Sequence, residues 1–84
     1  MVLQKMLTSE ILSTRFEQLG LDLPQYQLVE IRLLSGIKYE CICDIPDLNI
    51  TEFVSAHHPE RAKELVSIKV MEKLESLRLL PVYH

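Results

Sequence analysis

The feature that most constrains this chain is a long helical segment near its carboxyl end, bounded by Pro59 and Pro81. Proline suits the first turn of a helix, and the residue before a proline avoids helical angles, so a helix is predicted from Pro59 to about Leu80. At about 1.5 Å of rise per residue it spans roughly 33 Å, as long as a domain of this size is wide. One apolar stripe along it is formed by Ala62, Val66, Val70, Leu74 and Leu77.

Further apolar residues of this segment lie outside that stripe. Ile68 and Leu79 project well away from it, and Met71 lies at its margin. Because the chain has only 84 residues, it can build one modest core, and an amphipathic helix in a monomer needs one apolar stripe. We therefore expect the side of the helix that carries Ile68, Met71 and Leu79 to contact a second subunit.

An amino-terminal helix is predicted by a second pattern of apolar residues at three- and four-residue steps. Its members are Leu3, Leu7, Ile11, Leu12, Phe16 and Leu19. Thr8 or Ser9 could cap the start of this helix. Gly20 suits the left-handed position after the last turn, where Leu21 can contact Phe16. The segment 1–7 could instead be a short strand.

Two strand-like runs, 26–34 and 37–45, predict an antiparallel hairpin. A two-residue loop would set apolar side chains opposite charged ones. A three-residue loop with Gly36 in the left-handed position keeps one face continuously apolar, so this register is predicted. The expected pairs are Leu33 with Ile37, Ile31 with Tyr39, and Val29 with Cys41.

This register places Leu28 and Ile42 together on the face opposite the main apolar set. Two strands alone are marginal in water and need more strands or a helix to cover them. A sheet completed across a two-fold axis, or helices on both faces, would cover Leu28 and Ile42. Both residues therefore join the expected homodimer interface.

A short helix is predicted over residues 50–57. Asn49 and Glu52 have the spacing of a capping box. Leu48 and Phe53 occupy the two positions of a hydrophobic staple, which strengthens the same interpretation.

The charge distribution weighs against nucleic-acid binding by a single subunit. The net charge is −3, from 9 basic and 12 acidic residues, and no Lys or Arg occurs between Lys38 and Arg61. Phosphate recognition relies on clustered basic residues, so nucleic-acid binding is left as an alternative for a dimer only. The acid-rich stretch could instead meet a protein partner. Its candidate partner surface consists of Glu40, Asp44, Asp47 and Glu52.

Nothing in the sequence predicts export or membrane insertion. No apolar run approaches the roughly 20 residues of a membrane span. The amino terminus lacks a basic and then apolar signal with a cleavage site. Two cysteines are too few for a disulfide framework. We therefore expect a cytoplasmic protein with reduced thiols and no membrane contact.

Cys41 and Cys43, taken with His57 and His58, have the composition of a zinc or copper site. Their spacing is poor, because structural sites draw paired cysteines from a turn and adjacent histidine rings rarely converge on one point. The favoured interpretation is that both cysteines are core residues and that the protein holds no cofactor. No glycine-rich phosphate loop or oriented nucleophile–base pair is evident, so the protein is predicted not to be an enzyme.

Residues 1–84 are thus predicted to form a single small α+β domain. Its order is an amino-terminal helix, an antiparallel hairpin, a short helix and a long carboxy-terminal helix (αββαα), with a sheet that can extend across a dimer. We expect a non-enzymatic protein–protein interaction module, such as a regulator, adaptor or inhibitor, that acts as a homodimer. The expected interface residues are Ile68, Met71, Leu79, Leu28 and Ile42. The alternatives are a zinc- or copper-binding domain and a dimeric nucleic-acid-binding regulator.

Overall fold

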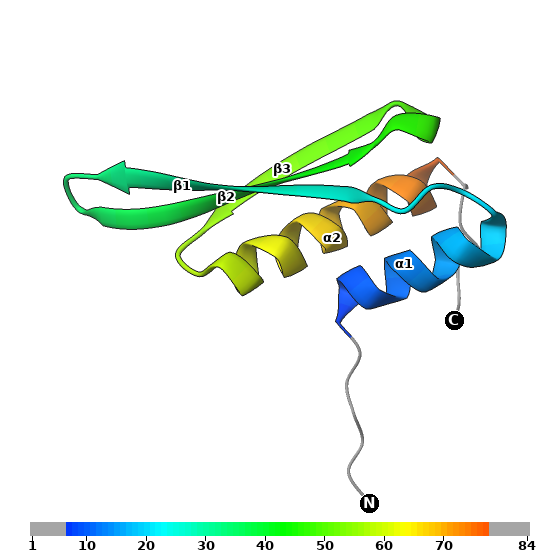
Figure 1. Cartoon of the computed structure of the whole chain (residues 1–84), viewed down its shortest axis with the longest axis horizontal. Coiled ribbons are helices and arrows are strands. Elements are labelled where there is room, and N and C mark those ends of the chain that lie inside the picture. Colours follow the sequence, from blue (N-terminus) through cyan, green and yellow to red (C-terminus); the bar gives the residue numbers. More distant parts are fainter. Residues whose placement is uncertain (1–6, 78–84) are drawn as a thin grey trace, which may run out of the picture.

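The computed structural model describes residues 7–77, in which two helices pack on one face of a three-stranded antiparallel sheet (Figure 1). Along the chain the elements are α1 (Thr8–Leu19), β1 (Gln25–Leu33), β2 (Gly36–Ile45), the 3-10 turn η1 (Pro46–Leu48), β3 (Ile50–Ala56) and α2 (Pro59–Ser76). The strands lie in the order β1-β2-β3, so β1 and β3 form the edges of the sheet. The predicted α+β class is confirmed. The predicted hairpin is present as β1 and β2 but belongs to a larger sheet, and residues 7–77 form two helices rather than three.

The carboxyl end of α1 is the one that its sequence predicts. Gly20 has a φ of 72°, in the left-handed region. The Leu21 amide donates to the Phe16 carbonyl at 2.9 Å, and the Gly20 amide donates to the Glu17 carbonyl at 3.1 Å, which together make a Schellman motif. Leu21 packs against the core beside this turn. The question of helix or strand over residues 1–7 lies almost entirely outside the described residues.

The stripe predicted for α2 forms one side of the core. Ala62, Val66, Val70 and Leu74 are fully buried, whereas Leu77, beyond the end of the helix, is exposed. They pack with Leu12 and Phe16 of α1 and with Cys41, Cys43, Ile45 and Ile50 of the sheet. The helix begins at Pro59 as predicted and ends at Ser76, four residues before the predicted end at Leu80. Leu79 lies outside the described residues.

The prediction of a short helix over residues 50–57 is wrong, because residues 50–56 form the edge strand β3. Its side chains alternate, with Ile50 buried and Phe53 exposed, and β-branched and aromatic residues favour this pleated arrangement. Asn49 starts no helix. It adopts a left-handed φ of 54°, and its amide donates to the Pro46 carbonyl at 3.1 Å, which closes the turn between β2 and β3.

The predicted hairpin register is also wrong, by one residue. Leu33 pairs with Gly36 and Leu28 pairs with Cys41, around a two-residue turn. The reason lies in Tyr26, whose ring packs against the core and whose hydroxyl lies 2.8 Å from the Ser67 hydroxyl of α2. A one-residue slip would turn Tyr26 to the other face, because side chains of a strand alternate.

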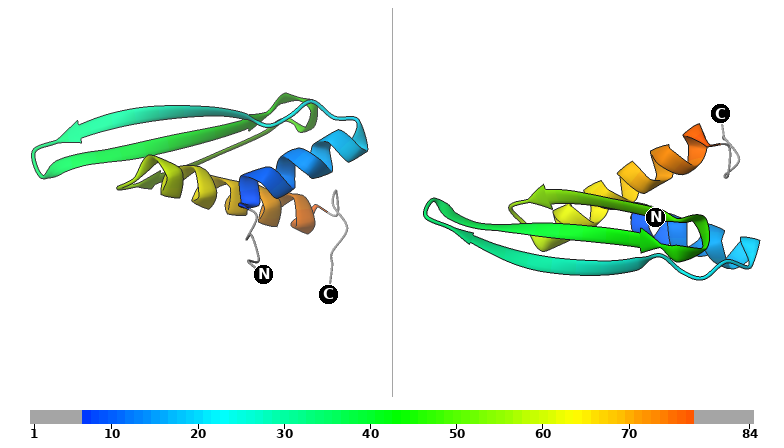
Figure 2. Two further views of the ribbon diagram at one scale, coloured as in Figure 1. Left: turned by 60° about the horizontal axis from the view of Figure 1, so that its bottom comes forward. Right: turned by 90° about the horizontal axis from the view of Figure 1, so that it is seen from above.

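The corrected register has two consequences for the surface. Leu28 lies on the helix-covered side of the sheet and Ile42 lies on the opposite side, so the two do not share the face predicted for them. The hairpin end of β1 and β2 also extends beyond both helices, as both views in Figure 2 show.

Candidate functional site

One face of the sheet has no described element over it, and we call it the bare face (Figure 2). Five apolar residues share it: Val29, Ile31 and Leu33 of β1, Ile42 of β2 and Phe53 of β3. Leu33 is 49% exposed and Phe53 is 59% exposed, while the other three are half-buried by their neighbours. Large exposed apolar side chains gathered on one surface typically mark a contact with another molecule.

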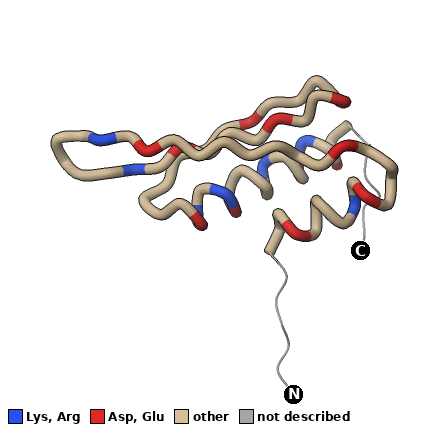
Figure 3. Tube along the Cα trace, in the orientation of Figure 1, with Lys and Arg blue, Asp and Glu red and all other residues tan. Residues whose placement is uncertain are grey.

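The bare face also carries charges of both signs. Lys38 pairs with Ile31 across β1 and β2, while Glu40 pairs with Val29. Asp44 lies at the other end of β2 and accepts a hydrogen bond from the Thr51 hydroxyl at 2.9 Å. In Figure 3 the basic positions of the hairpin lie toward its free end, and the acidic positions lie closer to η1.

The four acidic residues predicted as a partner surface do not share one surface. Glu40 and Asp44 lie on the bare face of β2. Asp47 lies in η1, where its carboxylate accepts a hydrogen bond from the Asp22 amide at 3.2 Å. Glu52 faces the helices and forms an ion pair with Lys69 of α2, with 3.6 Å between the charged atoms.

Lys69 covers the free edge of β3. Its ammonium group donates to the Phe53 carbonyl at 3.4 Å and lies 5.4 Å from the centroid of the Phe53 ring. The same group pairs with Glu52. A lysine at a sheet edge discourages the addition of another strand, because a new neighbour would have to displace and desolvate its charge.

The free edge of β1 differs. No backbone hydrogen bond from another element within residues 7–77 reaches the outer side of its backbone. Glu30 and Arg32 pair with each other at 3.2 Å on exposed side chains near the hairpin end. Alternate residues of this nine-residue strand therefore direct amide and carbonyl groups outward, away from β2.

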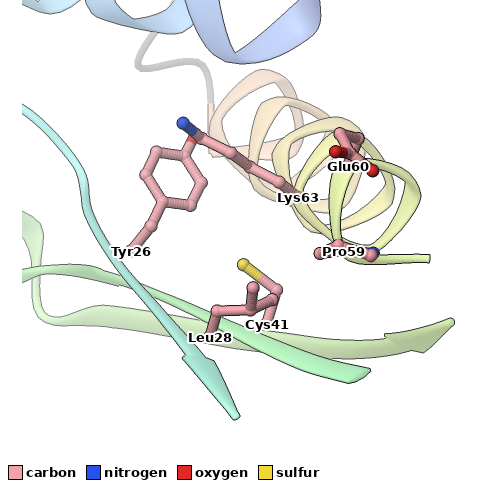
Figure 4. A pocket seen from close by; sticks show the side chains of 6 residues that line it. All are labelled: Tyr26, Leu28, Cys41, Pro59, Glu60 and Lys63. Carbon is pink, nitrogen blue, oxygen red and sulfur yellow. The ribbon is translucent and has the colours of Figure 1, made fainter. Parts of the chain in front are cut away.

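A cavity of about 290 Å³ adjoins this edge, between β1 and the first turns of α2. Its lining consists of Tyr26, Leu28, Cys41, Pro59, Glu60 and Lys63 (Figure 4). Lys63 lies over the Tyr26 ring, with its ammonium nitrogen 4.8 Å from the ring centroid. Leu28 is 49% exposed, because α2 packs mainly over β2 and β3.

A second cavity of about 260 Å³ lies between the first turns of α1 and α2. Glu60 and Lys63 line both cavities, so the two are neighbours, and we call them together the groove. Glu64 in this second cavity already accepts hydrogen bonds from the amide of Thr8, at 2.8 Å, and from its hydroxyl. Sequence reasoning missed this groove, because its walls come from segments far apart in the chain.

The two thiols are not activated for nucleophilic chemistry. Burial raises the pKa of Cys41, and it raises the pKa of Cys43 to about 11. Burial also raises the pKa of the Tyr26 phenol to about 12. All three groups are therefore protonated at neutral pH, and a protonated thiol is a poor nucleophile and metal ligand. The Cys41 sulfur points into the cavity beside β1 (Figure 4).

The four residues of the alternative zinc or copper site are not brought together. Cys41 and Cys43 are buried in the core, while His57 and His58 are exposed in the connection between β3 and α2. Across residues 7–77, no three His, Cys, Asp or Glu side chains are grouped so that they could hold one metal ion.

The predicted interface residues lie on different surfaces. Ile68 is 36% exposed on α2, and Met71 is half-buried against the core. Leu28 lines the cavity beside β1, and Ile42 lies on the bare face. The structure thus separates residues that were expected to act together.

Comparison with known proteins finds no matching family model, no matching curated protein and no matching solved structure. Within the described part of the chain, neither helix combines the length and the apolar character that a membrane span requires.

Proposed function

We propose that the protein is a small non-enzymatic protein–protein interaction module, of the regulator, adaptor or inhibitor kind, and that it forms a homodimer through the bare face. The observation that supports this proposal is the position of the two helices, which cover one side of the sheet only. An antiparallel sheet that faces water normally alternates apolar and polar residues. Here Leu33 and Phe53 are exposed on the side that should be polar.

The charges on this face favour a second copy as the partner. Lys38 lies toward the hairpin end and Asp44 toward the opposite end of β2. Two copies related by a two-fold axis, with their strands antiparallel, bring the basic end of one face to the acidic end of the other. Such sheets pack at about 10 Å with interdigitated side chains.

The size of the face predicts a weak and reversible dimer. Three strands about 4.8 Å apart and about 30 Å long present roughly 400 Å² per copy. Both copies together then bury less than the ~1,200 Å² at the lower limit of stable interfaces. The dissociation constant should therefore be micromolar rather than nanomolar.

Sedimentation velocity of the full chain over about 5 to 500 μM tests this proposal. The sedimentation coefficient of the wild type should rise with concentration. A Leu33→Glu, Phe53→Glu variant should stay monomeric with an unchanged circular dichroism spectrum, because both side chains are exposed.

The control is Ile68→Glu, which places a single glutamate on the exposed side of α2. It should dimerise like the wild type. If Ile68→Glu abolishes association while the bare-face variant keeps it, the interface lies on α2 instead. A wild type that is monomeric throughout this range would rule out the homodimer.

A further inference from the structure

The groove beside β1 lies on the opposite side of the sheet from the bare face, and nothing in the proposed dimer occupies it. We propose that this groove binds an extended, basic peptide segment of another protein, which adds to the free edge of β1 as a fourth strand. Peptide recognition of this kind draws affinity from main-chain hydrogen bonds and specificity from pockets for alternate side chains. The groove offers both.

The main-chain component follows from the difference between the two sheet edges. Lys69 covers the edge of β3 with a hydrogen bond to the Phe53 carbonyl and an ion pair with Glu52. Within residues 7–77 no backbone hydrogen bond from another element reaches the outer edge of β1, and its charged side chains Glu30 and Arg32 pair with each other. A strand can therefore add at β1 without displacing a charge, whereas at β3 it cannot.

The side-chain component follows from the cavity. Side chains of a strand added to β1 alternate between the bare face and the helix side of the sheet. Those on the helix side stand next to Tyr26 and Leu28, which form the near wall of the 290 Å³ cavity. Leu28 and the Cys41 sulfur give this cavity an apolar floor. A long unbranched or γ-branched apolar side chain, such as Leu or Met, fits this space.

The charge component comes from two carboxylates on the groove. Glu60 lines both cavities and Glu10 lines the second. Within residues 7–77 no basic side chain pairs with either of them. Lys63, which also lines both cavities, lies over the Tyr26 ring. Lysine or arginine two residues from the apolar side chain would lie on the same side of the added strand and could reach these carboxylates.

The same charges favour a different protein over a second copy of this chain. A second copy carries the same net charge of −3, and its own β1 holds one acidic and one basic residue, Glu30 and Arg32, so that strand brings no net positive charge. The favoured occupant is thus a segment whose charge is opposite to that of the groove.

The probe is an acetylated and amidated heptapeptide of sequence TKVLTKT with a fluorescent label, which sets its leucine and both lysines on one side of a strand. Fluorescence anisotropy should show saturable binding to the full chain, which weakens as salt is added. N-methylation of the backbone amides of alternate peptide residues distinguishes addition of the peptide as a strand from insertion of its leucine side chain alone. Methylating one alternate set should weaken binding at least tenfold, while methylating the other set should leave it unchanged.

Two pairs of variants locate the site. Glu60→Lys should weaken binding of the peptide at least fivefold, and the charge-swapped peptide TEVLTET should recover affinity for this variant. Glu72→Lys is the control, because it makes the same change at an exposed position further along α2. Leu28→Ala should also weaken binding, whereas Leu33→Ala, on the same strand but on the bare face, should not.

The proposal is overturned if the wild type does not bind TKVLTKT, if both methylated peptides bind equally well, or if Glu60→Lys and Glu72→Lys behave alike. It is also overturned if a peptide of residues 25–33 binds in place of the basic peptide, since the occupant would then be a second copy. Loss of the dimer in the Leu33→Glu, Phe53→Glu variant leaves these measurements interpretable, because that variant alters the other face of the sheet.

Discussion

Lys69 lies across Phe53 at the β3 edge of the sheet, with its ammonium nitrogen 3.4 Å from the Phe53 carbonyl oxygen and 5.4 Å from the centroid of the ring. One side chain of α2 thus shields both the backbone and the aromatic face of an edge strand. The opposite edge, formed by β1, has no such cover within the described residues. The two edges of this sheet are therefore chemically unequal, and we expect another strand to join at β1 rather than at β3.

Removing the charge of Lys69 should leave the β3 edge open to another strand. Lys69→Met keeps the length of the side chain but removes the ammonium group, so the free energy of unfolding should change by less than about 1 kcal/mol. Association through β3 should increase, as light scattering at high protein concentration would show. Lys73→Met, at an exposed position four residues along α2, is the control. Equal scattering from both variants would show that Lys69 does not protect the edge.

Glu64 caps α1 from the other helix. It accepts hydrogen bonds from the amide of Thr8, at 2.8 Å, and from its hydroxyl, which places a negative charge at the amino end of α1. Glu64→Ala should lower the free energy of unfolding by about 1–2 kcal/mol in urea titration. Glu64→Gln keeps one acceptor oxygen and should lose less. Glu75→Ala, exposed in the last turn of α2, should have little effect, and a loss equal to that of Glu64→Ala would contradict this capping role.

Glycine is needed at position 20 because of the backbone conformation there, and not because a side chain would lack space. Its φ is 72°, and a Cβ placed there would meet nothing within 4 Å. Gly20→Ala should therefore destabilise the protein by about 1 kcal/mol, the cost of a left-handed conformation for alanine. Gly20→Asn should cost less, since asparagine tolerates this region. Thermal unfolding of both variants tests this order of stabilities. A Gly20→Ala variant as stable as the wild type would show that the helix can end differently.

Stability should decrease at alkaline pH because of Cys43. Burial raises the pKa of its thiol from 9.0 in the absence of the fold to about 11. The unfolded chain thus loses this proton at a lower pH than the folded protein does. The stabilisation that the protonated Cys43 thiol contributes is fully present below pH 9 and is lost as the pH rises toward 11. Urea titrations under reducing conditions should show this decrease.

Cys43→Ala provides the comparison for that measurement. Its stability should depend less on pH between 9 and 10 than that of the wild type. Tyr26, whose pKa is raised from 10.0 to about 12, should contribute to a further decrease in both proteins above this range. Identical pH profiles below pH 10 would show that Cys43 is not the group responsible.

Local signals correctly predicted where α1 ends and where α2 begins. Gly20 and Leu21 made the predicted Schellman motif, and Pro59 began the second helix, because turns and caps depend on residues close in sequence. Four members of the predicted stripe on α2 are buried, since the periodicity of a helix records which side faces the core.

The sheet was harder to predict because its determinants are distant in sequence. Residues 50–56 show both a capping spacing and a strand-like alternation, and pairing with β2 decides between them. The hairpin register depends on the contact of Tyr26 with Ser67, which are 41 residues apart. The groove joins α1, β1, β2 and α2, so no local pattern of residues could reveal it.

The overhang of the hairpin divides β2 into two parts of different character. Toward η1 this strand is core, with Cys41, Cys43 and Ile45 buried, and toward the turn at residues 34–35 it is surface. Amide protons should therefore exchange with solvent in a gradient along the strand, fastest at its first residues. A molecule that binds the overhang would slow exchange at these first residues and so reduce the gradient. Exchange rates along β2 can therefore detect binding that leaves the rest of the domain unaltered.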